Sequence, residues 1–466
     1  MHINHRSTIV RRPVPQSLFA PLALLPEGWA RDVRLVIEDG RVVALDANSA
    51  PRPGDNLLAE RALLPAPSNL HSHTFQRAMA GMTERRGPSP DSFWTWRRLM
   101  YKFLDHLTPD QVEAIAAFAF MEMVEAGFAA VAEFHYLHHR PGGGAYDNPA
   151  EMSERIAAAA ATAGIGLTLL PVLYTYGGAE AAPLNGGQLR FGCDVARFLA
   201  LVEGAPKLAP DGVIGSAPHS LRATTPEELR ELISARLPGP THIHAAEQVE
   251  EVAQIEAWLG TRPVDYLLSE VGLDAGWCLI HATQMTETET RELAVSGAVA
   301  GLCPITESSL GDGIFNGPAF LEAGGVFGIG TDSNIQIGLA PELRQLEYSQ
   351  RLRDRARNVL APAGASTGNT LFAGALRGGA RALGRDTGGI RVGAWADMLT
   401  LDRDHPTMIA LDDGQLVDGF IFAGPRNAVR DVWSAGRYMV RDGRHVERAR
   451  IEAAWRETMA TLRALI

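Results

Sequence analysis

The sequence has few cysteines and no long apolar run, which are the features that mark disulfide-rich proteins and membrane proteins. Cysteine occurs only at Cys193, Cys278 and Cys303, an odd and scattered set that argues against a disulfide framework and for a reducing compartment. No apolar run is long enough to cross a membrane, and Ser17 to Pro26 is too short and too broken by proline for a signal segment. We therefore expect a cytoplasmic protein with no membrane partner.

Positive charge is also limited. The chain has 43 basic and 54 acidic residues, a net charge of −11, which disfavours a nucleic-acid partner. Lysine occurs only at positions 102 and 207, so nearly all the positive charge is arginine. The rest of the composition, 46% hydrophobic and 21% charged, is typical of a globular protein.

Both ends of the chain are rich in short β segments. An Asp39-Gly40 turn between two apolar runs indicates a hairpin near the N-terminus. Similar runs recur from residue 389 onward, at 396–402, 429–433 and 438–443. We expect residues 1–64 and 385–466 to form one small β-sandwich domain.

The middle of the chain, residues 65–384, alternates strand-like and helical patterns. A Thr108-Pro109-Asp110 start, for example, predicts a helix that Gly127 ends. Eight strand-like runs with helices between them indicate an α/β fold, a (β/α)₈ TIM-like barrel; an open doubly wound sheet is the alternative. The runs are 63–69, 129–134, 166–173, 212–216, 241–244, 277–281, 298–302 and 325–330.

Metal-binding and ionisable side chains follow six of these eight runs. Because the site of such a barrel lies at the C-terminal strand ends, they are expected to share one rim. His71 and His73 should point to the same face, since side chains at i and i+2 do so in a strand. The full set is His71, His73, Glu133, His135, Tyr136, His219, Ser220, Arg222, His242, His244, Glu247, His281 and Asp332.

Imidazole and carboxylate ligands suit a divalent ion such as Zn²⁺. The arrangement His-x-His, a middle-strand His and an Asp after the last strand resembles the amidohydrolase superfamily. The resemblance implies His71, His73, His244 and Asp332 as ligands of one Zn²⁺ per subunit, and Fe²⁺ would fit the same set. Members with two metals commonly bridge them with a carboxylated lysine, and neither lysine here lies in a suitable run; a bridge through Glu133 stays open. His242, two residues deeper, is expected to be structural.

His244, Glu247, His281 and Asp332 resemble the deaminase branch of that superfamily. A bound Zn²⁺ lowers the pKa of its water from 15.7 to about 7. We expect the metal-bound hydroxide to attack a C=N carbon, with Asp332 taking the proton. Glu247 and His281 then return a proton to the leaving ammonia, in a division of roles that the sequence does not decide.

Arg222 beside His219, and Arg97 in an aromatic segment, favour an acidic substrate, because arginine binds carboxylates in bidentate fashion. Gln76 and Tyr136 add neutral donors. Longer segments resemble the formimidoylglutamate deiminases: 73–81, 92–101, 132–136, 219–223, 244–247 and 308–315.

That family hydrolyses N-formimidoyl-L-glutamate, a small dicarboxylate amidine, to N-formyl-L-glutamate and ammonia in histidine degradation. The resemblance implies Gln76, Arg97, Tyr136, His219 and Arg222 as substrate-binding residues, and a homodimer. It leaves open whether Arg97 acts in the site of its own subunit or in that of the partner. One departure is Asn334, where some members have histidine. The alternatives are a deaminase that acts on a ring such as guanine or an adenosine derivative, and a non-catalytic scaffold.

Overall fold

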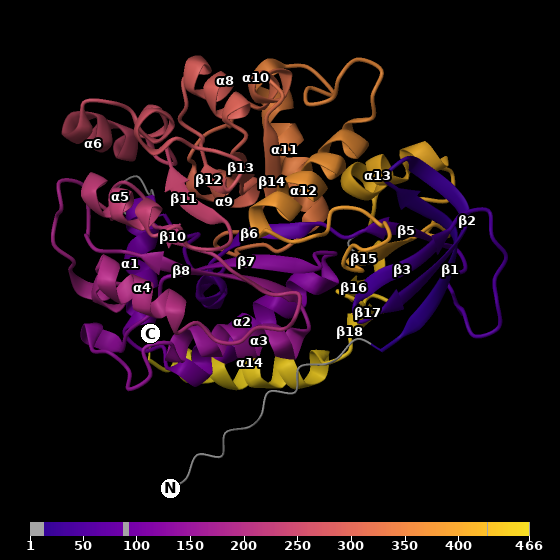
Figure 1. Ribbon diagram of the computed structural model, residues 1–466, viewed down its shortest axis with the longest axis horizontal. Coiled ribbons are helices and arrows are strands. Elements are labelled where there is room, and N and C mark those ends of the chain that lie inside the picture. The colour runs from indigo at the N-terminus through magenta and orange to yellow at the C-terminus, as the bar shows by residue number, and fades with distance from the viewer. Residues whose placement is uncertain (1–13, 87–92, 426, 466) are drawn as a thin grey trace, which may run out of the picture.

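The computed structural model describes residues 14–86, 93–425 and 427–465. A β-sheet made from both ends of this part of the chain lies beside a larger body of alternating strands and helices (Figure 1). In the described ranges, no helix is both long and apolar enough to span a membrane.

The larger body is a ring of parallel strands. One sheet has the order β10-β8-β7-β6 with β9 beside β8, and another has the order β11-β12-β13-β14. Parallel bridges from Ser216 to Thr241 and from Ser220 to His244 join the two sheets on one side, and a bridge from Ser72 to Asp332 joins them on the other. The ring is therefore closed, which confirms the (β/α)₈ barrel over the open sheet.

The barrel strands are short and almost wholly buried, as expected for a parallel sheet covered by helices. The fourth strand is split into two pieces, β9 and β10. The strands are β6 (Ser68–Ser72), β7 (Ala130–His135), β8 (Gly166–Leu173), β9 (Val213–Ile214), β10 (Ala217–Pro218), β11 (Thr241–Ala245), β12 (Trp277–His281), β13 (Val299–Leu302) and β14 (Val326–Ile329).

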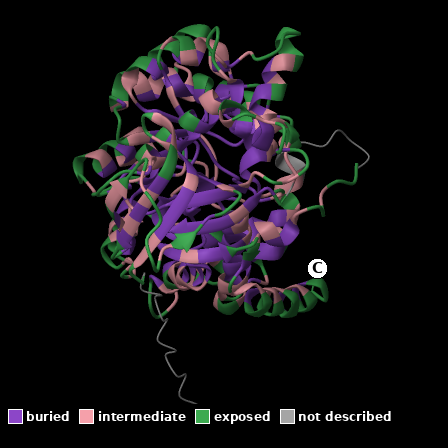
Figure 2. Cartoon of the chain, turned by 90° about the vertical axis from the view of Figure 1, so that its right-hand side faces the viewer, coloured by how far each residue is buried: buried purple, intermediate pink, exposed green. Residues whose placement is uncertain are grey.

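Helices surround this ring, and exposed residues gather on their outer faces while the strands inside are buried (Figure 2). The helices are α1 (Phe93–Leu104), α2 (Pro109–Glu125), α3 (Glu151–Ala163), α4 (Val195–Glu203), α5 (Pro226–Ser234), α6 (Val249–Leu259), α7 (Pro263–Tyr266), α8 (Glu287–Ser296), α9 (Pro304–Leu310), α10 (Gly317–Glu322), α11 (Leu339–Asp354), α12 (Thr367–Leu383), α13 (Leu416–Asp418) and α14 (Arg448–Arg463).

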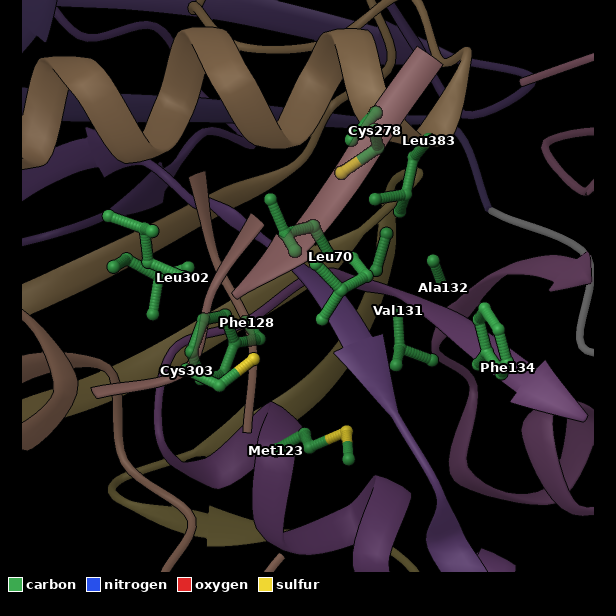
Figure 3. Close-up of a cluster of buried hydrophobic side chains, with 14 of the residues drawn as sticks. Leu70, Met123, Phe128, Val131, Ala132, Phe134, Cys278, Leu302, Cys303 and Leu383 are labelled. Atoms are coloured by element: carbon green, nitrogen blue, oxygen red, sulfur yellow. The ribbon is translucent and has the colours of Figure 1, made fainter. Parts of the chain in front are cut away.

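Helix α2 begins as the sequence predicts. The Thr108 side chain accepts a hydrogen bond from the Gln111 amide, and the Gln111 side chain accepts one from the Thr108 amide. Pro109 takes the first helical position. The buried face of α2 then packs on the barrel. Figure 3 shows Met123 of this helix in one cluster with Leu70 of β6, Val131 of β7 and Leu302 of β13.

The sheet outside the barrel has nine strands, in the order β18-β17-β16-β15-β5-β1-β2-β3, with β4 beside β1. It folds over a separate core in which Leu18 and Val33 lie in one cluster with Met398 and Trp433. Both ends of the chain therefore build one β unit, as predicted. Its strands are β1 (Gln16–Leu25), β2 (Gly28–Glu38), β3 (Arg41–Asp46), β4 (Asn56–Leu57), β5 (Arg61–Pro65), β15 (Met398–Asp402), β16 (Val429–Ser434), β17 (Arg437–Arg441) and β18 (Arg444–His445).

The predicted hairpin joins β2 and β3. Asp39 and Gly40 both have positive φ, 48° and 82°, which is the conformation of a tight turn that matches strand twist. Gly40 has a second reason to lack a side chain, because a Cβ there would lie 2.7 Å from the Ala435 carbonyl oxygen.

One detail of the predicted elements was wrong. The run from Leu63 to Asn69 is not one strand: Leu63 and Leu64 belong to β5 of the nine-stranded sheet, and the first barrel strand starts at Ser68. Helix α6 starts at Val249, so Glu247 lies in the loop before it.

The C-terminal helix α14 lies along the barrel and not on the β unit (Figure 1). The Trp455 ring stacks on Phe118 of α2 with centroids 4.3 Å apart. We propose the division of the chain at residues 64/65 and 384/385 from the sequence pattern, with α14 as an arm of the β unit that covers α2.

A buried ion network connects the two units. The Asp211 carboxylate, in the loop before β9, accepts two hydrogen bonds of 2.7 Å from Arg437 of β17 and one of 3.1 Å from Arg385. Arg385 also donates to Asp397 at 3.0 Å. Each buried charge therefore has an opposite partner, as burial requires.

Candidate active site

Four side chains from three parts of the barrel meet at one point. His71, His73, His244 and Asp332 are all buried, and each offers a ligand atom within 4.8 Å of the others. Asp332 Oδ1 lies 3.4 Å from Nε2 of His71 and 3.4 Å from Nε2 of His73. The structure thus brings together all four residues predicted as ligands.

The donor set fits a divalent metal ion. Nδ1 of His73 donates to the Phe134 carbonyl at 2.9 Å, and Nδ1 of His244 donates to the His219 carbonyl at 3.0 Å. Each bond leaves an Nε2 lone pair for the centre, the usual support of a metal-binding histidine. Burial lowers the pKa of His73 and lowers that of His71 and His244 well below the ordinary value, so these imidazoles are neutral as ligation requires.

Backbone hydrogen bonds hold the first and last strands in register at this point. The Asp332 amide donates to the His71 carbonyl at 3.0 Å, and the His73 amide donates to the Asp332 carbonyl at 2.9 Å. Asp332 has a φ of 43°, a strained conformation for a residue other than glycine. Asn334 supports the turn, since its side chain donates to the Asp332 carbonyl and to Ser72 Oγ.

Glu133 and His242 form hydrogen bonds with residues outside the cluster of four ligand candidates. Glu133 Oε1 accepts hydrogen bonds from the amide and hydroxyl of Thr74 at 2.7 and 2.6 Å, and burial raises its pKa to about 7. His242 donates from Nε2 to the Ala382 carbonyl at 2.7 Å. Within the described ranges, neither belongs to either of the two groups of close ligand atoms, which are His71, His73, His244 and Asp332, and His281, Cys303 and Asp332.

His281 and Glu247 lie beside the cluster. Nε2 of His281 is 3.8 Å from Glu247 Oε1 and 3.8 Å from Asp332 Oδ2. Burial opposes the charged imidazolium, but Glu247, a hydrogen bond to Glu307 and Asp332 raise the pKa of His281 to about 10. Burial also raises the pKa of Glu247. A proton can therefore be held or moved among these three groups at the edge of the cluster.

A cavity opens above the cluster, and every residue predicted to bind substrate lines it. Gln76 Nε2 donates to Tyr136 Oη at 2.8 Å. Arg97 reaches the cavity from α1 of the same chain, so it needs no partner subunit to do so. The lining comprises His73, Gln76, Trp96, Arg97, Met100, Tyr136, Tyr174, Phe191, His219, Arg222, His244, Glu247, His281, Thr306, Leu310, Asp332 and Ser333.

Several residues around the site were missed in the sequence. Glu307 Oε1 accepts a hydrogen bond from His281 Nδ1 at 3.2 Å, and Tyr174 lines the cavity after β8. The Glu251 carboxylate accepts the amides of Ala246 and Glu247. Tyr174 directly follows the third strand-like run and Glu307 lies five residues after the seventh, so reading a few residues past those two runs would have found both.

Comparison with known proteins places the chain in a family. A model described as the amidohydrolase family matches residues 62–439. A second, described as the N-terminal domain of formimidoylglutamate deiminase HutF, matches residues 16–59. The first match spans most of the chain, and the second covers β1 to β4 of the β unit.

Individual relatives agree. The formimidoylglutamate deiminase of Pseudomonas aeruginosa is 47% identical over 96% of this chain and 99% of its own. A 5-methylthioadenosine/S-adenosylhomocysteine deaminase of Natronomonas pharaonis is 31% identical over 90% of this chain and 91% of its own. The crystal structure of an amidohydrolase from Brucella melitensis is 50% identical, with a TM-score of 0.92, over 96% of this chain and 99% of that one.

A more distant structure shares the fold alone. An adenosine deaminase from Xanthomonas campestris, solved with bound zinc, is 22% identical over 97% of this chain, with a TM-score of 0.80. The full-length matches, the closed barrel and the buried His and Asp cluster lead to one assignment. The chain belongs to the amidohydrolase family and, within it, to the formimidoylglutamate deiminases.

Proposed function

We propose that this enzyme hydrolyses N-formimidoyl-L-glutamate to N-formyl-L-glutamate and ammonia, in histidine degradation. The observation that carries the proposal is a single cavity that joins the His71, His73, His244 and Asp332 cluster to two arginines, Arg97 and Arg222. The cluster supplies hydrolytic chemistry, and the arginines suit a substrate with two carboxylates.

His71, His73, His244 and Asp332 would hold one divalent ion, for which we propose Zn²⁺, with Fe²⁺ as an alternative. When bound, such an ion supplies Lewis-acid activation of water near neutral pH. Asp332 then takes the proton that the water loses, because its Oδ1 faces the histidines and its Oδ2 faces His281. The water oxygen bonds to the formimino carbon of the substrate.

Glu247 and His281 act on the other side of the same carbon. They hold the formimino nitrogen and return the proton to it. As the bond between the carbon and this nitrogen breaks, the second proton of the added water also passes to the nitrogen, which leaves as ammonia. The carbon keeps the oxygen as the carbonyl of the formyl product. Glu307 keeps His281 oriented through Nδ1, so that Nε2 faces Glu247 and Asp332.

Recognition of the rest of the substrate falls to the cavity wall. Arg97 and Arg222 bind carboxylates, and His219, which burial keeps neutral, adds a hydrogen bond. Gln76 and Tyr136 form a hydrogen-bonded pair beside His73. Because an uncharged purine needs no arginine pair, the wall favours formimidoylglutamate over a ring substrate.

The test is an ammonia-release assay on purified enzyme with formimidoylglutamate, guanine and S-adenosylhomocysteine as separate substrates, with and without a chelator. We expect ammonia from formimidoylglutamate alone, and loss of release with the chelator. Release from a purine but not from formimidoylglutamate would overturn the proposal. Chelator-resistant release would overturn the metal requirement.

We also propose a cytoplasmic homodimer. The three cysteines are buried and unpaired in the described part of the chain, which suits a reducing compartment. Sedimentation equilibrium tests the dimer, and fractionation of cells that produce the enzyme tests its location.

A further inference from the structure

Tyr174 lies at a position that the substrate roles above do not use. It directly follows β8, is buried, and lines the cavity. Its ring packs edge-on against His219, with centroids 4.6 Å apart, and its hydroxyl meets Arg97. Tyr174 therefore stands between two residues that the proposed function gives to the substrate.

The hydroxyl oxygen of Tyr174 accepts two hydrogen bonds. Arg97 Nη2 donates at 3.1 Å from the side of α1. Gln188 Nε2 donates at 3.3 Å from η3 (Gly186–Arg190). Both partners can only donate at these atoms, so both lone pairs of the tyrosine oxygen are used.

The orientation of the Gln188 amide supports this reading. Its Oε1 accepts the Asn185 amide at 3.1 Å, and its Nε2 also donates to the Gly177 carbonyl at 2.9 Å. A flipped amide would lose both bonds, so the nitrogen is the atom that faces Tyr174. Gln188 is buried behind Tyr174 and does not line the cavity.

The proton of the Tyr174 hydroxyl is then left for a ligand. Within the residues that the structure describes, the hydroxyl donates to no protein acceptor, and it lies at the cavity wall beside Arg97. Two donors that act on the oxygen also polarise the O–H bond and make it a better donor. An anionic group bound by Arg97 is the acceptor that this geometry suits.

We propose that Tyr174 is a further specificity-determining residue, whose hydroxyl donates to the substrate carboxylate that Arg97 binds while also holding the Arg97 guanidinium in place. This inference rests on the proposed function, because it requires a carboxylate substrate. On the Arg97 side of the cavity, Gln188 orients Tyr174, and Tyr174 and Arg97 together bind one substrate carboxylate.

The test compares Tyr174→Phe with wild type on three substrates: N-formimidoyl-L-glutamate, its side-chain amide and its α-carboxamide. A lost hydrogen bond to a charged group predicts a fall in kcat/KM of about tenfold or more on the natural substrate, carried by KM. Each amide lacks one of the two carboxylates of the substrate. For the amide that lacks the carboxylate bound by Tyr174, kcat/KM should be the same in Tyr174→Phe and wild type, and this result identifies that carboxylate.

Tyr176→Phe is the matched control, because it removes the same group two residues away, outside the cavity. It should leave all three substrates unaffected. Metal content and thermal midpoint are measured for each variant. An unchanged KM in Tyr174→Phe, or an equal loss on all three substrates, would overturn the inference.

Gln188→Glu gives a second route if Tyr174→Phe does not fold. Its carboxylate would accept the tyrosine proton and turn it away from the substrate, so KM for formimidoylglutamate should again rise; an unchanged KM contradicts the inference. If wild type does not hydrolyse formimidoylglutamate, the proposed function fails, and calorimetric binding of L-glutamate still tests Tyr174. Equal affinity in wild type and Tyr174→Phe would then exclude its carboxylate contact.

Discussion

The Nε2 atoms of His71 and His244 lie 3.1 Å apart in the buried centre of the barrel. Nδ1 of His244 is committed to the His219 carbonyl, so its Nε2 lone pair faces His71. Burial and, after it, the neighbouring imidazoles lower the pKa of both residues, which disfavours the charged imidazolium form of either one. A divalent ion bound at this point would be held by the Nε2 atoms of both residues, since imidazole nitrogen is a preferred ligand of Zn²⁺.

Removal of metal should therefore cost both activity and stability. A ligand that binds only the folded state at 1,000 times its Kd adds about 4 kcal/mol to the free energy of unfolding. We expect dialysis against a chelator to abolish ammonia release and to lower Tm, and added Zn²⁺ to restore both. Full activity in protein shown by elemental analysis to be free of metal would contradict this expectation.

Replacement of Asp332 by alanine should abolish turnover. The residue offers Oδ1 to the histidine cluster and Oδ2 to His281, so its loss removes both a ligand and the proton acceptor. Metal content by elemental analysis, measured with kcat, separates the two effects. Glu322→Ala is the control, because the side chain of Glu322 is 72% exposed at the end of α10, and it should be as active as wild type. Substantial turnover in Asp332→Ala would mean that another acid does this work.

Replacement of Arg222 by methionine should lower kcat/KM, because one hydrogen bond to a charged group is lost. The loss corresponds to about 1.5–3 kcal/mol of transition-state stabilisation. Arg222 is almost buried at the cavity wall, so solvent cannot replace the contact. Steady-state kinetics on formimidoylglutamate measure the loss. Arg197→Met, on the exposed surface of α4, is a matched control and should behave as wild type. Wild-type kinetics in Arg222→Met would remove the carboxylate role of this arginine.

The network around Asp211 should make stability depend on pH. Burial alone would raise the pKa of Asp211, but Arg437 and Arg385 lower it to about 2, from 3.8 in the unfolded chain. The folded state therefore binds this proton less readily than the unfolded state does. The stabilisation, on the order of 2 kcal/mol, is fully present above pH 3.8 and is lost as pH falls through about 2.

The comparison of wild type with Asp211→Asn measures this effect. We expect the variant to have a lower free energy of urea unfolding at pH 7 and the difference to shrink below about pH 4, as the wild-type carboxyl becomes protonated. A difference that stays constant to the lowest pH at which the protein folds would show that the charge of Asp211 does not matter.

Much of the candidate site could be predicted from local sequence patterns. The His-x-His spacing places His71 and His73 together because side chains alternate along a strand, and the other proposed ligands end apolar runs that parallel strands bring to one rim. Capping residues placed the start of α2 correctly, because Thr108 and Gln111 bond only their own helix end. These inferences needed contacts between residues close in sequence, or a topology shared by all such barrels.

Contacts between segments far apart in the sequence were predicted less well. The apolar run at Leu63 reads as one strand with Ser68 and Asn69, yet it pairs with β15, some 335 residues later, in the other sheet. Helix α14 follows the β strands in sequence but packs on α2 through Trp455 and Phe118. Burial of apolar area decides both, and it depends on which surface is left uncovered once the whole chain has folded.

The sequence by itself determined the barrel, the four candidate ligands and the arginines, since each follows from local periodicity, residue chemistry and resemblance. Only the tertiary structure decided that Glu307 orients His281, that Arg97 enters the cavity of its own chain, and that Gln188 and Arg97 meet on the Tyr174 hydroxyl. Hydrogen bonds of about 3 Å between residues 14 to 77 positions apart require precise placement of separate loops, and no local pattern encodes it.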